Sequence, residues 1–191
     1  MSLLELRVCE FLDEVAAGDR TSGAGSVAAL TTALAAGLLA KVARASGDWA
    51  EAGAVAAQAE SLRRRAAPLA ESSAKEYEAA LSARTESGLE AGERRDFALG
   101  QAFARAAEPP LQIAEAAADV AQLAVLVVRS GEPSLRADAA TAAALGASAA
   151  RAAAELVAVN LTASAGDERV VRASKLADEA ARAADVAFAG G

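Results

Sequence analysis

Apolar and polar positions along the chain fall into helix-length segments, separated by breaks rich in Gly, Pro and Ser, and strand-type runs of β-branched and aromatic residues are absent. Gly18 and Gly166 are suited to end helices, and Pro109-Pro110 opens one where a missing N–H costs nothing. The expected helices cover residues 2–17, 27–45, 48–87 with an interruption or kink at Pro68, 93–107, 109–129, 138–163 and 167–188. This pattern predicts one all-α domain over residues 1–191, a compact Ala-rich bundle of about six to seven helices.

The composition adds an expectation about assembly. Hydrophobic residues make up 54% of the chain but aromatic residues only 3%, so the apolar content is mostly Ala, Leu and Val. Ala is the best helix former, and its small side chain lets helices approach closely. A core lined by Ala buries little apolar area per residue. We therefore expect a homodimer or a higher oligomer.

The formal net charge of −7 argues against nucleic acid or an anionic membrane surface as partner, because both require a basic face. The most apolar stretches, Val27 to Ala45 and Leu111 to Val128, carry polar residues in their interior and are interpreted as buried helices rather than membrane spans. Cys9 is the only cysteine and the first residues lack a signal-peptide layout, which suits a cytoplasmic protein.

The sequence contains no histidine, which limits the residue types that could act in catalysis or bind a metal. The usual general base, the usual transition-metal ligand and every His-based triad are thereby excluded. Catalysis must rest on carboxylates, Lys, Ser, Tyr or backbone dipoles, and no metal is expected.

The loop from Gly18 to Ser26 precedes an apolar helix and contains Gly23 and Gly25. Small, flexible residues before a helix let backbone N–H groups converge on a ligand, and the helix N-terminus adds partial positive charge. The alternative is an ordinary loop in which Ser26 caps the helix. The spacing matches neither a P-loop nor a dinucleotide-binding turn.

Four further polar residues have two interpretations each. Lys41 interrupts an apolar face and is either a functional cation or a side chain that reaches past it to solvent. Asp138, at the expected start of the long Ala-rich helix, is either an N-cap or a catalytic carboxylate. Asn160 is a satisfied buried amide or part of a site, and Arg136 is a solvated loop charge or a supporting group.

Several segments, in order, resemble the formiminotransferase-cyclodeaminase C-terminal domain and methenyltetrahydrofolate cyclohydrolase family. The resemblance covers nearly the whole chain and rests on Phe11 to Ala16, Thr21 to Leu30, Leu69 to Tyr77, Arg95 with Ala106 to Leu111, Arg136-Ala137-Asp138, and Val159-Asn160-Leu161.

This resemblance implies an all-helical homodimer, or a higher oligomer of dimers, that acts on a tetrahydrofolate derivative at the subunit interface. Family members hydrolyse 5,10-methenyl-tetrahydrofolate or cyclise 5-formimino-tetrahydrofolate with loss of ammonia. Both reactions pass through a tetrahedral carbon between N5 and N10, for which a carboxylate is suited and no tightly bound cofactor is required.

Carried over onto this sequence, the resemblance implies that Gly23, Gly25 and Ser26 cradle the ligand, that Asp138 is the catalytic carboxylate, and that Arg136 and Asn160 support it. The chain departs from the family pattern at Arg20, Ser22 and Ala24 in the loop, at Ser73, where the family has an acid, and at Glu132, where it often has Asn. Two alternatives therefore stand beside the folate enzyme. One is a divergent paralogue that acts on a non-folate amidine or imine, and the other is an inactive helical dimer that binds a small ligand or a partner.

Asp138 and Asn160 are 22 residues apart, which is about 33 Å along a continuous helix. They cannot share one site within one subunit unless that helix is broken. An antiparallel partner could bring them together, so the sequence predicts a site built across a dimer.

Overall fold

The computed structural model describes residues 2–17, 23–86, 93–162 and 166–189, and every regular element in them is helical. In chain order the elements are η1 (Leu3–Glu5), α1 (Val8–Ala16), α2 (Ala24–Ala45), α3 (Ala52–Ala66), α4 (Leu69–Glu86), α5 (Glu93–Ala106), α6 (Glu108–Ser130), η2 (Pro133–Leu135), α7 (Arg136–Asn160) and α8 (Glu168–Ala189). The all-α class expected from the sequence is confirmed.

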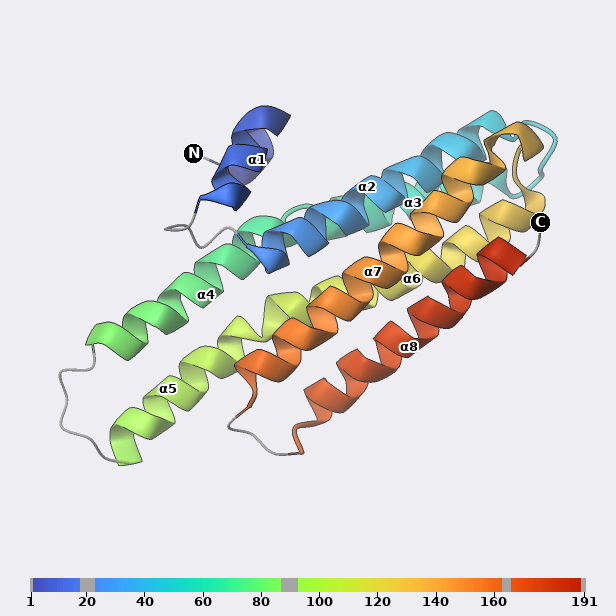
Figure 1. Ribbon diagram of the computed structural model, residues 1–191. Coiled ribbons are helices and arrows are strands. Elements are labelled where there is room, and N and C mark those ends of the chain that lie inside the picture. The colour runs from blue at the N-terminus through green and yellow to red at the C-terminus, as the bar shows by residue number, and fades with distance from the viewer. Residues whose placement is uncertain (1, 18–22, 87–92, 163–165, 190–191) are drawn as a thin grey trace.

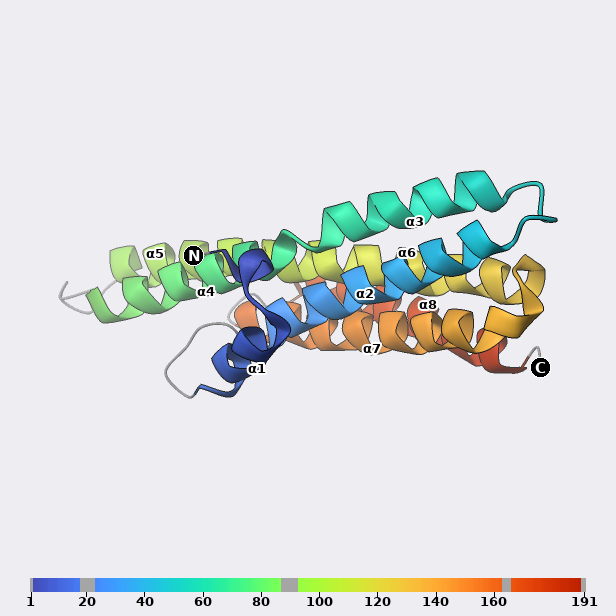
Figure 2. The same cartoon turned by 90° about the horizontal axis from the view of Figure 1, so that it is seen from above.

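The long helices α2, α6, α7 and α8 lie side by side and form the body of the molecule, with α3 packed on α2 (Figures 1 and 2). The most extensive contact joins α6 to α7. α4 and α5 form a pair that extends beyond one end of this body, while α1 stands apart from the bundle (Figure 1). α2 and α7 run antiparallel, so the first turn of α2 lies beside the last turns of α7 (Figure 1).

The core is built mainly from Ala, as the composition suggests, and few large side chains are fully buried. Leu39, Ile113 and Val120 are among them. Small residues let α6 and α7 approach closely: a Cβ added at Gly146 of α7 would lie 3.0 Å from the carbonyl oxygen of Ala117 of α6. Helix packing at this distance leaves little room for any side chain larger than that of Ala.

Helix boundaries differ from the sequence expectation at the N-terminal segment and at Pro68. The first expected helix is divided into η1 and α1, because Leu6 and Arg7 adopt extended backbone conformations. The Glu10 carboxylate then accepts a hydrogen bond from the Arg7 backbone N–H at 2.8 Å and stabilises the start of α1. Pro68 separates α3 from α4 fully, and this break accounts for the eight α-helices of the described residues where six or seven were expected.

The two apolar stretches singled out in the sequence, 27–45 and 111–128, lie within α2 and α6 and pack against other helices of the bundle. By length and composition alone, three helical segments of the described residues could cross a membrane: Ala24–Ala45, Arg95–Ser130 and Pro133–Asn160.

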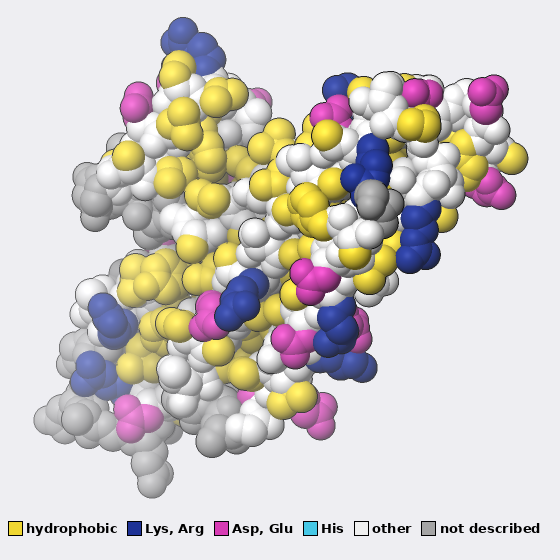
Figure 3. Space-filling view, turned by 45° about the vertical axis from the view of Figure 1, so that its right-hand side comes forward, with side chains coloured by type: hydrophobic (Ala, Val, Ile, Leu, Met, Phe, Trp, Pro, Cys, Tyr) yellow, Lys and Arg dark blue, Asp and Glu magenta, His cyan; other side chains and the backbone are white. Residues whose placement is uncertain are grey.

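The α1 segment presents an apolar surface that the other helices of the described residues leave exposed. No residue of α1 is buried, and Val8 and Leu12 are 77% and 62% exposed. In the space-filling view, hydrophobic side chains lie at the surface of this segment at the upper left, with basic and acidic side chains at its edges (Figure 3).

Candidate functional site

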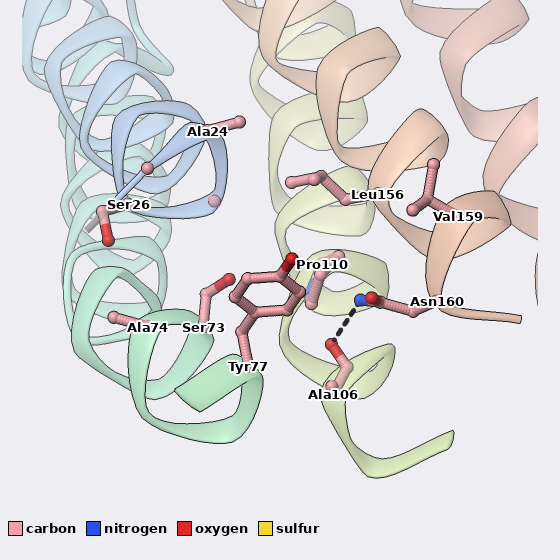
Figure 4. Close-up of a pocket in the computed structure, with 12 residues that line it drawn as sticks. Ala24, Ser26, Ser73, Ala74, Tyr77, Ala106, Pro110, Leu156, Val159 and Asn160 are labelled. Atoms are coloured by element: carbon pink, nitrogen blue, oxygen red, sulfur yellow. Dashed lines mark hydrogen bonds between the residues drawn. The ribbon is translucent and has the colours of Figure 1, made fainter. Parts of the chain in front are cut away.

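A pocket of about 240 Å³ opens at the end of the bundle where α2 begins and α7 ends (Figure 4). Three helices, α2, α4 and α7, and the α5–α6 junction meet there. The lining residues used below are Gly23, Gly25 and Ser26 of α2 and its N-cap, Ser73 and Tyr77 of α4, Ala106 and Pro110 at the junction, and Leu156, Val159 and Asn160 of α7.

The first turn of α2 forms one wall of the pocket. α2 begins at Ala24, three residues earlier than expected, and its N-cap is Gly23. The interpretation of Ser26 as N-cap is therefore wrong: Ser26 is buried in the first turn, and its Oγ donates a hydrogen bond to the carbonyl oxygen of Ala70 at 2.8 Å. Of the expected glycine-containing loop, Gly18 to Ser22 lie outside the described residues.

Gly25 allows α2 to approach α4 closely. A Cβ added at Gly25 would lie 2.0 Å from Ser73 Oγ and 2.9 Å from Ser73 Cβ, which are distances that real side chains do not tolerate. The same Cβ would lie 3.7 Å from Leu156 of α7. The absence of a side chain at this position is thus what brings the amide end of α2 against the two other walls.

Ser73 and Tyr77 were not among the predicted site residues. They are four residues apart on α4, so both project from the same face of that helix into the pocket (Figure 4). Ser73 is 7% exposed and Tyr77 40% exposed. In the sequence, the i, i+4 spacing of these two hydroxyl side chains indicates that they share one face of a helix. Only the packing of α4 against α2 shows that this face lines a pocket.

Asn160 closes the pocket from the end of α7. Its side chain is buried, and Nδ2 donates a hydrogen bond to the carbonyl oxygen of Ala106 at 2.9 Å (Figure 4). That bond fixes the amide plane and satisfies a carbonyl at the end of α5. Asn160 is therefore a satisfied buried amide and also a wall of the pocket, so its two interpretations are compatible.

The lining of this pocket holds no Asp, Glu, Lys or Arg among the described residues. Its polar groups are hydroxyls, one side-chain amide and the backbone amides that begin α2. A second hollow of about 540 Å³ between α4 and α5 shares Tyr77, Val159 and Asn160 with it and does include charged residues, Arg84 and Asp96.

Asp138 lies at the opposite end of the bundle from the pocket. α7 is continuous from Arg136 to Asn160, so Asp138 is about 33 Å from Asn160 along the helix axis. The N-cap of α7 is Leu135, so the interpretation of Asp138 as N-cap is wrong. Asp138 Oδ2 instead lies 2.6 Å from Lys41 Nζ near the end of α2.

Arg136 also belongs to the far end, where its Nη2 donates a hydrogen bond to the carbonyl oxygen of Ala187 at 3.2 Å and joins the start of α7 to the end of α8. The structure therefore brings Gly23, Gly25, Ser26 and Asn160 together in one chain and separates Arg136 and Asp138 from them. The catalytic role of Asp138 stays a prediction.

These features define an all-α bundle with a pocket at the N-terminus of a largely buried helix. The sequence profile of the formiminotransferase-cyclodeaminase family matches residues 7–182. The chain belongs to this family, as its motifs suggested.

A solved structure supports the fold. The crystal structure of formiminotetrahydrofolate cyclodeaminase from Thermotoga maritima superposes with a TM-score of 0.81, covering 98% of this chain and 94% of that protein, at 21% sequence identity. At this identity the likeness shows a shared fold. Among curated proteins, no significant match to the chain is found.

Proposed function

We propose that the protein is a folate one-carbon enzyme that acts at the carbon between N5 and N10 of a tetrahydrofolate derivative, by cyclising 5-formimino-tetrahydrofolate with loss of ammonia or by hydrolysing the 5,10-methenyl form. The observation that carries this proposal is the coincidence of family and site. The family profile spans residues 7–182, and the glycine-containing segment that carries the resemblance begins the helix whose first turn lines the pocket.

The pocket suits a flat, partly apolar ligand. Pro110, Leu156 and Val159 offer apolar surface, and the exposed ring of Tyr77 offers a face on which a heteroaromatic ring stacks. The amides of the first turn of α2 and the hydroxyls of α4 supply donors.

The described lining of the pocket in one chain contains no carboxylate or amine side chain that could transfer a proton in this reaction. Breaking a C–N bond at a tetrahedral carbon requires a group that carries a proton to the leaving nitrogen. The proposed carboxylate, Asp138, is about 33 Å from Asn160 within one chain. We therefore propose that the working enzyme is a dimer in which Asp138 of a second subunit faces this pocket.

The test combines an assay with a binding measurement. Loss of methenyl-tetrahydrofolate absorbance and release of ammonia from formimino-tetrahydrofolate measure the two reactions, and calorimetry with the same reduced folates measures binding. Tyr77→Ala should weaken binding about tenfold through loss of ring contact. Val186→Ala, at an equally exposed position on α8 (41% exposed), should leave binding unchanged. Absence of both binding and turnover with reduced folates would overturn the proposal.

A second candidate is a ligand-binding protein without catalytic activity. The lining without charged side chains and Ser73 at the position of a family acid favour it. Reduced folates that bind with the calorimetric heat expected of a pocket ligand but are neither hydrolysed nor cyclised would establish this alternative. Turnover of a non-folate amidine or imine would establish the divergent enzyme.

A further inference from the structure

The hydroxyl of Ser73 is one of the α4 donors of the pocket, and the proposed function assigns no particular ligand group to it. Ser73 is 7% exposed, and its Oγ makes no hydrogen bond to any described residue. Its neighbours behave differently: Ser72 Oγ donates to the carbonyl oxygen of Pro68, and Ser26 Oγ donates to that of Ala70. The Oγ atom is not sealed off, because the buried side-chain polar atom without a partner among the described residues is Arg95 Nε. The Ser73 hydroxyl points into the pocket, where a ligand can reach it (Figure 4).

The start of α2 presents a second set of donors beside it. The N-cap, Gly23, has no side chain with which to bond the first amides, and the next residues of the turn, Gly25 and Ser26, are buried. A Cβ built at Gly25 would lie 2.0 Å from Ser73 Oγ, so the hydroxyl packs against the first turn of the 22-residue helix α2. Such a helix start carries partial positive charge.

We propose that this corner of the pocket is a subsite for a carboxylate group, with Ser73 as the residue that determines its specificity. Backbone amides at a helix start together with a free hydroxyl are donors, and they bind an anion. They disfavour a cation, because the helix end repels it and the described lining of the pocket within one chain contains no carboxylate to balance it.

A carboxylate fits better than a phosphate. The described lining of the pocket contains no Lys or Arg, so a dianion would remain largely unneutralised in a partly buried site. A single negative charge matches the partial charge of one helix end. The subsite requires only that the ligand carry a carboxylate, and it is therefore independent of the folate reaction proposed above.

The experiment is an NMR titration of the ¹⁵N-labelled full chain with sodium acetate at constant ionic strength. Acetate should cause a saturable shift of the Gly25 and Ser73 amide signals. Ser73→Ala should weaken acetate binding about tenfold, since it removes a hydrogen bond to a charged group. Ser73→Asp should abolish binding through like-charge repulsion. Ser72→Ala, one residue away with its hydroxyl bonded to Pro68, is the matched control and should bind like the parent chain.

Circular dichroism of each variant verifies that the helices are intact. No saturable shift at any acetate concentration that the protein tolerates, or equal affinity in the Ser73→Ala and Ser72→Ala variants, would overturn the proposal. Tighter binding of inorganic phosphate than of acetate would replace the carboxylate assignment, and binding of methylammonium at the same amides would refute an anion subsite. Each of these results can be read without a folate assay, so failure of the folate proposal is distinguished from failure of this one.

Discussion

Arg169 shows how single residues hold the start of α8 to the rest of the bundle. Asp167 accepts hydrogen bonds from both the backbone N–H and the side chain of Arg169. Arg169 Nη1 also donates to the carbonyl oxygen of Ala104 and lies 2.7 Å from Glu108 Oε1. Hydrogen bonds from the Arg169 guanidinium, and to a smaller extent from its backbone N–H, lower the pKa of Asp167 to about 2. In turn, Asp167 and Glu108 raise the pKa of Arg169.

The lowered pKa of Asp167 predicts a pH dependence with a defined sign. The ionised carboxylate is favoured in the folded chain, so its contribution is present above the ordinary aspartate pKa of about 3.9 and is lost as the pH falls towards 2. Asp167→Asn should lower the Tm at neutral pH, and its difference from the parent chain should shrink as the pH falls from 4 through 2. Asp48→Asn, at an exposed aspartate, is the control and should give no such change. A Tm difference that is constant with pH would contradict the prediction.

Asp138 and Lys41 allow the catalytic proposal to be separated from a structural role. If Asp138 carries protons, Asp138→Asn should lower turnover about 10²-fold or more with little change in Tm. Lys41→Gln breaks the same 2.6 Å ion pair and leaves the carboxylate in place. Turnover should therefore survive in the Lys41 variant. If both variants kept the turnover of the parent chain, Asp138 would have no part in the mechanism. Its ion pair with Lys41 would then be only a partly exposed surface contact, which contributes little to stability.

At the scale of helices, contacts between small residues place the elements. Gly, Pro and Ser-rich breaks predicted most helices, because these residues act through local backbone preferences. They did not predict that α2 begins at Ala24 or that Ser26 bonds to Ala70, because those features depend on α4 packing against the first turn. The same reason explains why Ser73 was recognised only as a departure from a family motif.

Gly25→Ala tests the contact between α2 and α4. The substitution favours the helix intrinsically, but the new Cβ would collide with Ser73 Oγ and Cβ, so we expect a net loss of about 1–3 kcal/mol in the free energy of unfolding. Adding Ser73→Gly should recover the part of that loss due to the collision, measured as coupling in a double-mutant cycle by denaturant unfolding.

Gly100→Ala is the matched control, because a Cβ at Gly100 of α5 would meet nothing within 4 Å. It should be neutral or stabilising by up to about 1 kcal/mol. If Gly25→Ala behaves like Gly100→Ala, the two helices are not held together by this contact.

For the whole molecule, the sequence predicted the class of fold, and four of the six residues it named for a site, Gly23, Gly25, Ser26 and Asn160, line one pocket. The pocket lies where α2, α4, α6 and α7 meet, and a pattern along the chain does not show which helix ends come together. The spacing of Asp138 and Asn160 did predict that they are distant if α7 is continuous, and α7 is continuous. Whether a second subunit joins them is a question of assembly.

We expect a dimer in dilute solution. The chain has a mass of 19.0 kDa, a core built mainly from Ala, and an α1 segment whose Val8 and Leu12 are exposed. Multi-angle light scattering should give about twice the chain mass at micromolar concentration. Leu12→Asp should shift the mass towards the monomer if α1 lies in the interface, while Val171→Asp on α8 serves as the control at an equally exposed position (67% exposed). A stable monomer of the parent chain would remove both the dimer and the shared site.

The Ala-lined core has a calorimetric consequence. Unfolding exposes apolar surface, which raises the heat capacity, and backbone polar surface, which lowers it. In a helix bundle whose buried side chains are mostly methyl groups, unfolding exposes a large area of backbone and a comparatively small area of hydrocarbon. The heat-capacity increment should therefore lie below the usual 12–15 cal/mol/K per residue, roughly, so that the stability curve is flatter and broader than that of a bundle of Leu and Ile. Scanning calorimetry over a range of pH would measure that increment as the slope of unfolding enthalpy against Tm.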